Sequence, residues 1–380
     1  MRQVVSPGFI DIQLSGAYGV DFSNGPGLNI EDILLVARRL LANGVTSFCP
    51  TMVSSSRETY RQVIPLENAS ATILGMHLEE PFFALSKCGA HDSKHIVAPS
   101  KGMKSVREAY GFDASSDDAD DDEHPLEEVD IITMAPELDG ASEAMRSLTK
   151  HQYSDNKHSI VISCGHTEAS YEDGIKALSN GANLLTHLFN AMNPFHHRHR
   201  GLVGLLSSEL KLARLGLNQP YYSMIVDGIH VHKSAVSMAY KSHPHGCVLV
   251  TDAMAGMGLG DGKHSLGDMS VFIEGDRATI LGTDTLAVLF LDTCIRRFKQ
   301  FTDCSIGEAL LCATLHPAMV LKRHIAGRED ILTVGAVDGA PIGVLQVGAA
   351  SDLVLLNDDF EVLGTWVRGK KAVEQLPKQN

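Results

Sequence analysis

Residues 221–252 read YYSMIVDGIHVHKSAVSMAYKSHPHGCVLVTD, and this stretch contains a complete strand–helix–strand unit. The runs at 221–227 and 247–252 are short and mostly apolar, which is typical of buried strands. Residues 232–241 between them have the length and spacing of a helix. Two strands joined by a helical crossover run parallel, so this stretch predicts one unit of a parallel sheet.

The same alternation extends along most of the chain. Asn29 can cap a helix whose apolar stripe ends before Gly44. Eight strands separated by helix-length segments predict a (β/α)₈ barrel of the TIM type. A doubly wound open sheet is the alternative, but no glycine-rich phosphate loop follows the first strand. The other strands are expected at 8–12, 45–49, 72–77, 129–134, 159–163 and 183–187, and the other helices at 29–43, 56–67, 138–150 and 168–179.

The pattern changes after the last barrel strand. We expect a hairpin at 269–281 with its turn at 274–276, helices at 284–300 and 305–319, and short strands at 352–356 and 362–367. The barrel is assigned to residues 1–345, and residues 346–380 to the C-terminal strands of a small β-sandwich whose N-terminal half is missing. A lone hairpin is marginal in water, so these last strands are expected to lack partners.

Charge narrows the range of partners. The net charge of −14 argues against nucleic acid, because phosphate backbones are bound through clustered lysine and arginine. Seven of these negative charges lie in an acidic loop at 113–124, which we expect to be solvated. The loop contains Asp113, Asp117, Asp118, Asp120, Asp121, Asp122 and Glu123.

The chain carries no sequence signal for a membrane. No apolar run approaches the roughly 20 residues of a transmembrane helix, and the first residues lack the pattern of a cleaved signal peptide. Seven scattered cysteines without CxxC spacing favour reduced thiols in a cytoplasmic protein.

Five polar side chains fall at the carboxyl ends of five predicted strands, where a barrel builds its active site. Each has a plain structural alternative: a strand-end histidine is more often a hydrogen-bonded structural residue, Glu79 can form a solvated pair with Glu80, and Asp252 can cap a helix. Those alternatives do not explain why all five meet at one end of the barrel. The five are Glu79, His166, His187, His230 and Asp252.

This set of residue types suits metal-dependent hydrolysis. One glutamate and two histidines can hold Zn²⁺ with a fourth position open for water, and the metal lowers the pKa of that water. A neighbouring aspartate is then needed to move the proton. The sequence therefore predicts a catalytic metal rather than a structural one.

The chain resembles the N-acetylglucosamine-6-phosphate deacetylases, metal-dependent amidohydrolases that remove an acetyl group from an amino-sugar phosphate. The similarity covers nearly the whole chain, in an ordered and specific set of segments. They are PGFIDIQLSGAYGVDF (7–22), HLEEPFF (77–83), KCGAH (87–91), GHTEAS (165–170), THLFNAMNPFHHR (186–198), DGIHV (227–231), LVTDAM (249–254), LHPA (315–318) and VGAASDLVLL (347–356).

The resemblance implies a role for each matching residue. Asp252 would be the catalytic acid–base, and one divalent metal would bind each subunit of a homodimer. His91, with the backbone of Ala90, would contact the substrate near the acetyl carbonyl, and His91 would act in catalysis by polarising that carbonyl. The implied metal ligands are Glu79, His166 and His187; the implied contacts to the sugar are Asn190 and Ala191, and those to the 6-phosphate are Arg198 and His230.

Departures from the family pattern keep other functions open. Residues 13–15 read Gln-Leu-Ser where many barrel amidohydrolases carry His-x-His, which favours a single metal, zinc first, with iron, manganese or cobalt as alternatives. Glu80 replaces a glycine, His199-Arg200 replaces an acidic residue and proline, and the segment 286–292 is shorter. The alternatives are an amidohydrolase for another N-acyl amino sugar, or a homologue that binds a sugar phosphate with impaired catalysis.

Overall fold

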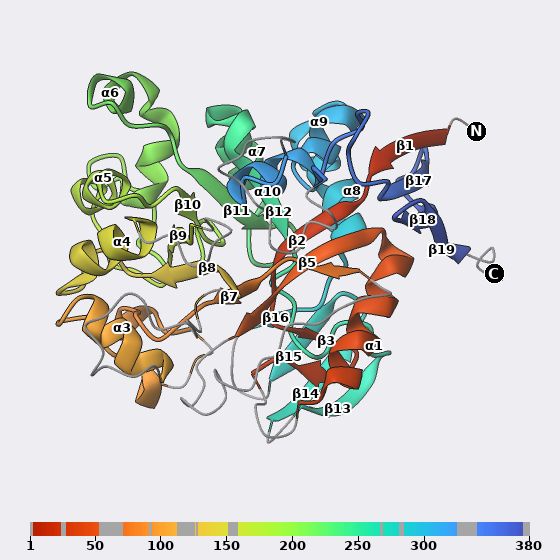
Figure 1. Cartoon of the computed structure of the whole chain (residues 1–380), viewed down its shortest axis with the longest axis horizontal. Helices are drawn as coiled ribbons and strands as arrows, with labels where there is room; N and C mark the ends of the chain where they lie inside the picture. Colours follow the sequence, from red (N-terminus) through yellow and green to blue (C-terminus); the bar gives the residue numbers. More distant parts are fainter. Residues whose placement is uncertain are drawn as a thin grey trace.

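The computed structural model describes residues 3–23, 28–52, 71–89, 91, 93–111, 126, 128–150, 159–266, 269–280, 285–324 and 340–374. Eight parallel strands follow one another around a barrel in chain order (Figure 1). They are β2 (Phe9–Leu14), β5 (Val45–Met52), β7 (Met76–Leu78), β8 (Val129–Met134), β9 (Val161–Cys164), β10 (Leu184–Leu185), β11 (Tyr221–Ile225) and β12 (Cys247–Val250). A short strand, β6 (Thr72–Ile73), also pairs with β5.

The barrel closes between its first and last strands. Leu14 and Ala253 form a parallel bridge, and the backbone N–H of Asp252 donates to the carbonyl of Gln13 at 2.9 Å. The predicted (β/α)₈ class and all eight predicted barrel strands are therefore confirmed. A closed barrel brings the carboxyl ends of all eight strands to one rim, so side chains far apart in sequence meet there.

Helices follow most of the strands. Asn29 caps α1 (Ile30–Leu40) by accepting hydrogen bonds from the backbone of Glu31 and Asp32, and Gly44 ends the segment with φ +79°. The expected helices at 138–150, 168–179 and 232–241 are α4 (Ala141–Lys150), α5 (Tyr171–Ser179) and α7 (Lys233–Ser242). Two further helices are α3 (Met103–Tyr110) and α6 (Glu209–Arg214). The expected helix 56–67 and the acidic loop 113–124 lie outside the described residues.

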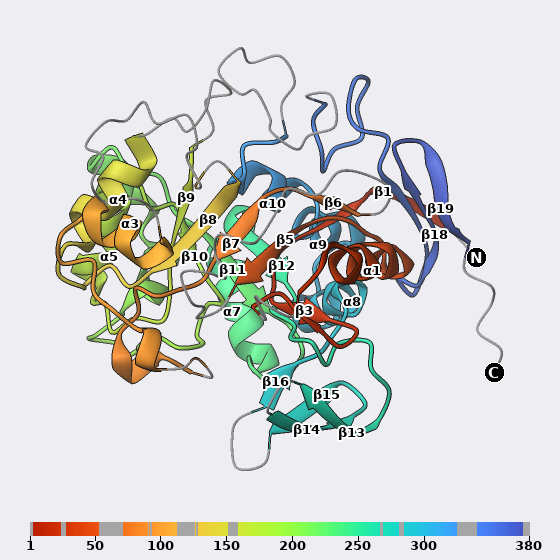
Figure 2. The same cartoon turned by 60° about the horizontal axis from the view of Figure 1, so that its bottom comes forward.

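A second sheet follows β12, at the bottom of Figure 2. The predicted hairpin is its centre, β14 (Met269–Glu274) and β15 (Arg277–Ile280), flanked by β13 (Gly262–Leu266) and β16 (Thr285–Ala287). The predicted start of the helix expected at 284–300 is too early, because residues 285–287 form a strand that pairs with the edge of β15. That edge supplies backbone hydrogen bonds to an apolar run, and α8 starts only afterwards, at Leu291–Thr302.

The expected helix 305–319 is interrupted. It consists of α9 (Ile306–Leu311) and α10 (Leu315–Val320). Thr314 lies between them with φ −131° and ψ −82°, which no α-helix can include.

The C-terminal strands form a small antiparallel sheet beside the barrel, at the right of Figure 1. The expectation that they lack partners is wrong. The strand β1 (Gln3–Pro7) precedes the barrel and pairs along its whole length with β17 (Leu353–Asn357), which continues into β18 (Val362–Val367) and β19 (Lys370–Glu374). The VVSP run before the first barrel strand thus supplies the missing backbone partners.

Buried apolar side chains form two clusters. The larger lies between the strands and α1, α4, α5, α7 and α8, and the smaller includes side chains of α10. Beside the smaller cluster, Arg323 and Asp130 form a buried ion pair at 2.8 Å, and Arg323 also donates to the carbonyl of Leu74. In the described part of the chain, no helix is long and apolar enough to span a bilayer.

Candidate metal and substrate site

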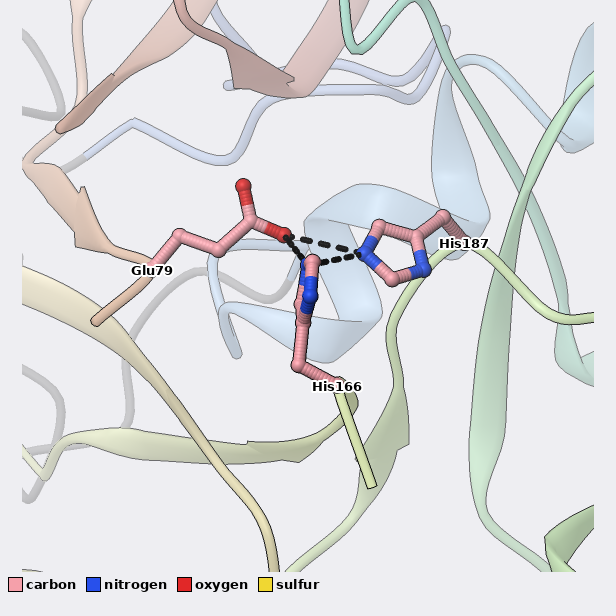
Figure 3. A group of neighbouring side chains, drawn as sticks. All are labelled: Glu79, His166 and His187. Atoms are coloured by element: carbon pink, nitrogen blue, oxygen red, sulfur yellow. Dashed lines mark hydrogen bonds and ion pairs between the residues drawn. The ribbon is translucent and has the colours of Figure 1, made fainter. Parts of the chain in front are cut away.

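Three of the predicted side chains converge on one point at the barrel rim (Figure 3). Glu79 follows β7, His166 follows β9 and His187 follows β10. The Oε1 atom of Glu79 lies 3.2 Å from Nε2 of His187 and 3.6 Å from Nε2 of His166, and the two Nε2 atoms are 2.9 Å apart. Among the described residues this is the one group of three or more that could hold a metal ion.

The geometry and the surroundings of this cluster fit a bound cation. A tetrahedral metal with bonds of about 2.1 Å places its ligand atoms about 3.4 Å apart, close to the separations found here. The Nδ1 atom of His166 lies 2.8 Å from the carbonyl oxygen of Lys87, to which it donates. That bond fixes the tautomer and leaves Nε2 with a free lone pair.

Electrostatics favour the metal-binding protonation state at two of the three side chains, Glu79 and His166. Burial lowers the pKa of His166 to about 4, so the imidazole is neutral at physiological pH. Burial alone would raise the pKa of Glu79, but its contacts with His166 and His187 hold that pKa well below the usual range. A carboxylate and a neutral imidazole are the forms that bind metals.

The backbone at the rim is strained. His166, His187 and Asp252 have φ values of +47°, +31° and +47°, and Ala191 in the following loop has +46°. Residues with a Cβ atom rarely adopt such angles, and they cost roughly 1–3 kcal/mol each. The surrounding loops must therefore hold three of the site's polar side chains in place.

Asp252 is joined to the cluster by Gln13, a residue whose contacts the sequence did not predict. The Nε2 atom of Gln13 donates to Oε1 of Glu79 at 2.7 Å and to Oδ1 of Asp252 at 3.2 Å. Its Oε1 atom accepts from the hydroxyl of Thr186 at 2.8 Å. Burial and the nearby charge of Glu79 raise the pKa of Asp252 to about 8. The sequence holds one signal for this role, because Gln13 lies near the carboxyl end of β2, where many barrel amidohydrolases carry a metal-binding histidine.

His91 also lies beside the cluster. Its ring centre is 4.7 Å from that of His166 and 5.2 Å from that of Phe83. Glu80 is fully buried, and its carboxylate contacts Nδ1 of His91. The carboxylate at this glycine position of the family is therefore paired with His91 rather than directed toward solvent.

The remaining predicted residues are divided between the rim and the surface. Asn190 lies three residues after His187, and its backbone N–H donates to the carbonyl of His187 at 2.9 Å; the carbonyl of Ala191 accepts from the backbone N–H of Thr167. His230 contacts Asp227 at 2.5 Å. The exposed side chain of Arg198 lies outside the buried cluster, with Nε 3.0 Å from Nε2 of His197. Ala90 lies outside the described residues.

The family model described as Amidohydrolase family matches residues 4–328, most of the chain. The chain belongs to the amidohydrolase family. Within that family it is similar to N-acetylglucosamine-6-phosphate deacetylases. It is 40% identical to the Bos taurus protein over 97% of this chain and 83% of the relative, and 31% identical to the Bacillus subtilis protein over 97% and 84%.

Solved structures of amidohydrolases have the same fold. The N-acetylglucosamine-6-phosphate deacetylase of Thermotoga maritima is 30% identical, with a TM-score of 0.75 over 98% of this chain and 90% of that one. A mutant of the Mycobacterium smegmatis deacetylase, solved in complex with N-acetyl-D-glucosamine-6-phosphate, is 28% identical, with a TM-score of 0.74 over 98% and 87%.

Proposed function

We propose that this amidohydrolase removes the acetyl group of N-acetylglucosamine 6-phosphate, giving glucosamine 6-phosphate and acetate. The observation that carries the proposal is the buried cluster of Glu79, His166 and His187 with Asp252 joined to it through Gln13. The identity of 40% over 97% of the chain to deacetylases named for this substrate supports the choice of substrate.

The chemistry begins with water. One divalent cation, which we propose is zinc, would be held by Glu79, His166 and His187, where it supplies Lewis acidity and lowers the pKa of water. Asp252 accepts the proton of the attacking water as its oxygen bonds to the acetyl carbon. Asp252 then gives that proton to the amide nitrogen, so that the carbon–nitrogen bond breaks and a neutral amine leaves. Gln13 keeps the carboxylate of Asp252 aligned for both transfers.

The substrate would be recognised at the two sides of this centre. We assign the acetyl side to His91 and to the backbone of Ala90, and the sugar to Asn190 and Ala191. The 6-phosphate goes to the cationic Arg198 and to His230, which Asp227 orients. Because the carboxylate of Glu80 is buried against His91, its charge does not argue against a phosphorylated substrate.

We propose that the enzyme is a homodimer in which part of the phosphate contact comes from the neighbouring subunit. The exposure of Arg198 on a loop that carries it away from the buried cluster supports this arrangement. The free state of all seven cysteines supports a reducing compartment, and we place the enzyme in the cytoplasm. Light scattering on the purified chain measures the dimer directly, and a monomeric mass would contradict it.

The test of the function is acetate release from N-acetylglucosamine 6-phosphate by zinc-loaded protein, with Asp252→Asn as the matched control. We expect turnover by the parent chain and a loss of about 10²–10⁴-fold in the variant, the usual contribution of a general acid–base. Turnover of unphosphorylated N-acetyl sugars but not of the 6-phosphate would instead favour another N-acyl amino sugar as substrate. Binding of the sugar phosphate without hydrolysis would refute the enzyme assignment.

A further inference from the structure

The carboxylate of Glu137 binds the two residues that follow the metal ligand His166. Glu137 lies in the loop between β8 and α4, and β8 pairs with β9, the strand that His166 follows. Its Oε2 atom accepts the hydroxyl of Thr167 at 2.5 Å, and its Oε1 atom accepts the backbone N–H of Glu168 at 2.6 Å. The carboxylate of Glu137 thus accepts one hydrogen bond at each of its two oxygens.

The segment needs such support because it belongs to no helix or strand. The strand β9 ends at Cys164 and α5 begins only at Tyr171, while His166 between them has φ +47°. A residue in this conformation persists only where its surroundings determine it.

The second loop beside the segment also holds it. The backbone N–H of Thr167 donates to the carbonyl of Ala191 at 3.0 Å, and the side chain of Asn193 donates to the carbonyl of Glu168 at 2.7 Å. Residues 167–168 are thus fixed between the loop of Glu137 on one side and the loop that follows His187 on the other. His187 is the next metal ligand, so the same contacts connect two of the three ligands.

We propose that Glu137 is a positioning residue that holds His166 for the metal through Thr167 and Glu168. Glu137 does not belong to the metal-ligand cluster, and the segment TMAPELDG in which it stands carries no motif that indicates a role. The inference rests on the proposed metal-dependent function, but metal binding can be measured without any substrate.

The test compares Glu137→Ala with Asp139→Ala. Asp139 is an exposed acid in the same loop and serves as the matched control. Zinc affinity is measured by competition with a chelator, and the visible spectrum of the cobalt-loaded protein reports the geometry of the ligands. We expect Glu137→Ala to lose roughly 10–100-fold in zinc affinity, as residues that orient metal ligands do, with an altered cobalt spectrum. Asp139→Ala should retain both properties of the parent chain.

A second pair of variants separates positioning from general stability. Thr167→Val preserves the shape of the side chain but removes its hydroxyl, which donates to Glu137 and accepts from the backbone N–H of Ala169 at 2.8 Å. It should therefore weaken zinc binding in part through the contact that Glu137→Ala also removes. The double variant with Glu137→Ala should then lose less zinc affinity than the sum of the two single losses, because both substitutions break the same hydrogen bond between Thr167 and Glu137. If Glu137→Ala does not fold, Glu137→Gln carries the test. The glutamine keeps an acceptor for the backbone N–H of Glu168, so this single variant should lose less zinc affinity than the double variant of Glu137→Gln with Thr167→Val.

Unchanged zinc affinity and an unchanged cobalt spectrum in folded Glu137→Ala would overturn the proposal. So would fully independent effects of Glu137→Ala and Thr167→Val. Failure of the parent chain to release acetate would refute the proposed function alone, because the zinc and cobalt measurements stand apart from turnover.

Discussion

Gln13→Leu removes the amide that lies between the carboxylates of Glu79 and Asp252 while keeping a side chain of similar volume. Gln13 is almost fully buried, so water does not readily replace the lost donor. The two lost hydrogen bonds, at 2.7 and 3.2 Å, both end on carboxylates, and a bond to a charged group contributes about 1.5–3 kcal/mol. Since the bond to Asp252 is the longer and weaker one, we take the lower end of this range, roughly 1.5–2 kcal/mol, as the loss felt in catalysis, which is about 10–30-fold in kcat/KM.

The same variant should move the pH profile in a known direction. Burial and the charge of Glu79 already raise the pKa of Asp252 to about 8, and a bound cation lowers it again. The Nε2 donor of Gln13 stabilises the ionised carboxylate, so its removal raises the pKa of Asp252 further. A general base acts only when deprotonated. The acid limb of kcat/KM, the part that falls as pH falls, should therefore shift to higher pH.

The assay is acetate release between about pH 5 and pH 9 by protein of measured zinc content. Thr186→Val is the matched control, because it removes the bond to Oε1 of Gln13 and leaves both bonds to the carboxylates in place. It should affect kcat/KM less than Gln13→Leu does. Zinc-loaded Gln13→Leu with the parent kcat/KM and an unmoved acid limb would refute the reasoning.

Three further predictions concern stability and substrate binding. Arg323→Met removes the cation that pairs with the buried carboxylate of Asp130, which should cost about 3–5 kcal/mol in urea unfolding, and adding Asp130→Leu should recover part of that loss; no recovery would contradict the ion-pair argument. Burial raises the pKa of Asp11 to about 7, so the folded chain binds this proton more tightly than the unfolded chain does. The parent should therefore lose stability relative to Asp11→Asn as pH rises from about 4 to about 7, and parallel curves would speak against it. Arg198→Ala should raise KM for the 6-phosphate with little change in kcat, whereas a fall in kcat alone would remove Arg198 from phosphate binding.

The sequence allowed the barrel to be predicted because each strand signal is local. A short apolar run followed by a helix-length segment is visible in the chain itself. Asn29 correctly marks the start of α1, and Gly44 marks the end of the 3-10 turn at Leu41–Asn43 that continues it. The partner of β17 could not be found in this way. Its pairing with β1 joins residues about 350 positions apart, and neither segment indicates the other. The strand β16 was missed for the same reason, since it forms only against the edge of β15.

In the candidate site, too, some residues could be predicted from the sequence and others could not. Glu79, His166, His187 and Asp252 could be placed because their residue types and strand-end positions both point to the rim. The residues that orient them have no such signature. Gln13, Glu137 and Thr186 are ordinary polar residues in the sequence, and their importance arises from hydrogen bonds of 2.5–3.2 Å to residues far away in the sequence.

Hydrogen bonds between neighbouring loops explain how strained residues remain in place around the rim. The backbone of Ala84 donates to the carbonyl of His166, Thr167 donates to Ala191, and Asp252 donates to Gln13. Each loop thus fixes a residue that follows another strand. These hydrogen bonds can offset the conformational free energy of the residues with positive φ angles, which is roughly 1–3 kcal/mol each. A variant in one loop should then disturb a ligand carried by another. The effects of substitutions in these neighbouring loops on metal affinity should accordingly be non-additive. Substitutions at distant sites such as Arg323 should instead have additive effects.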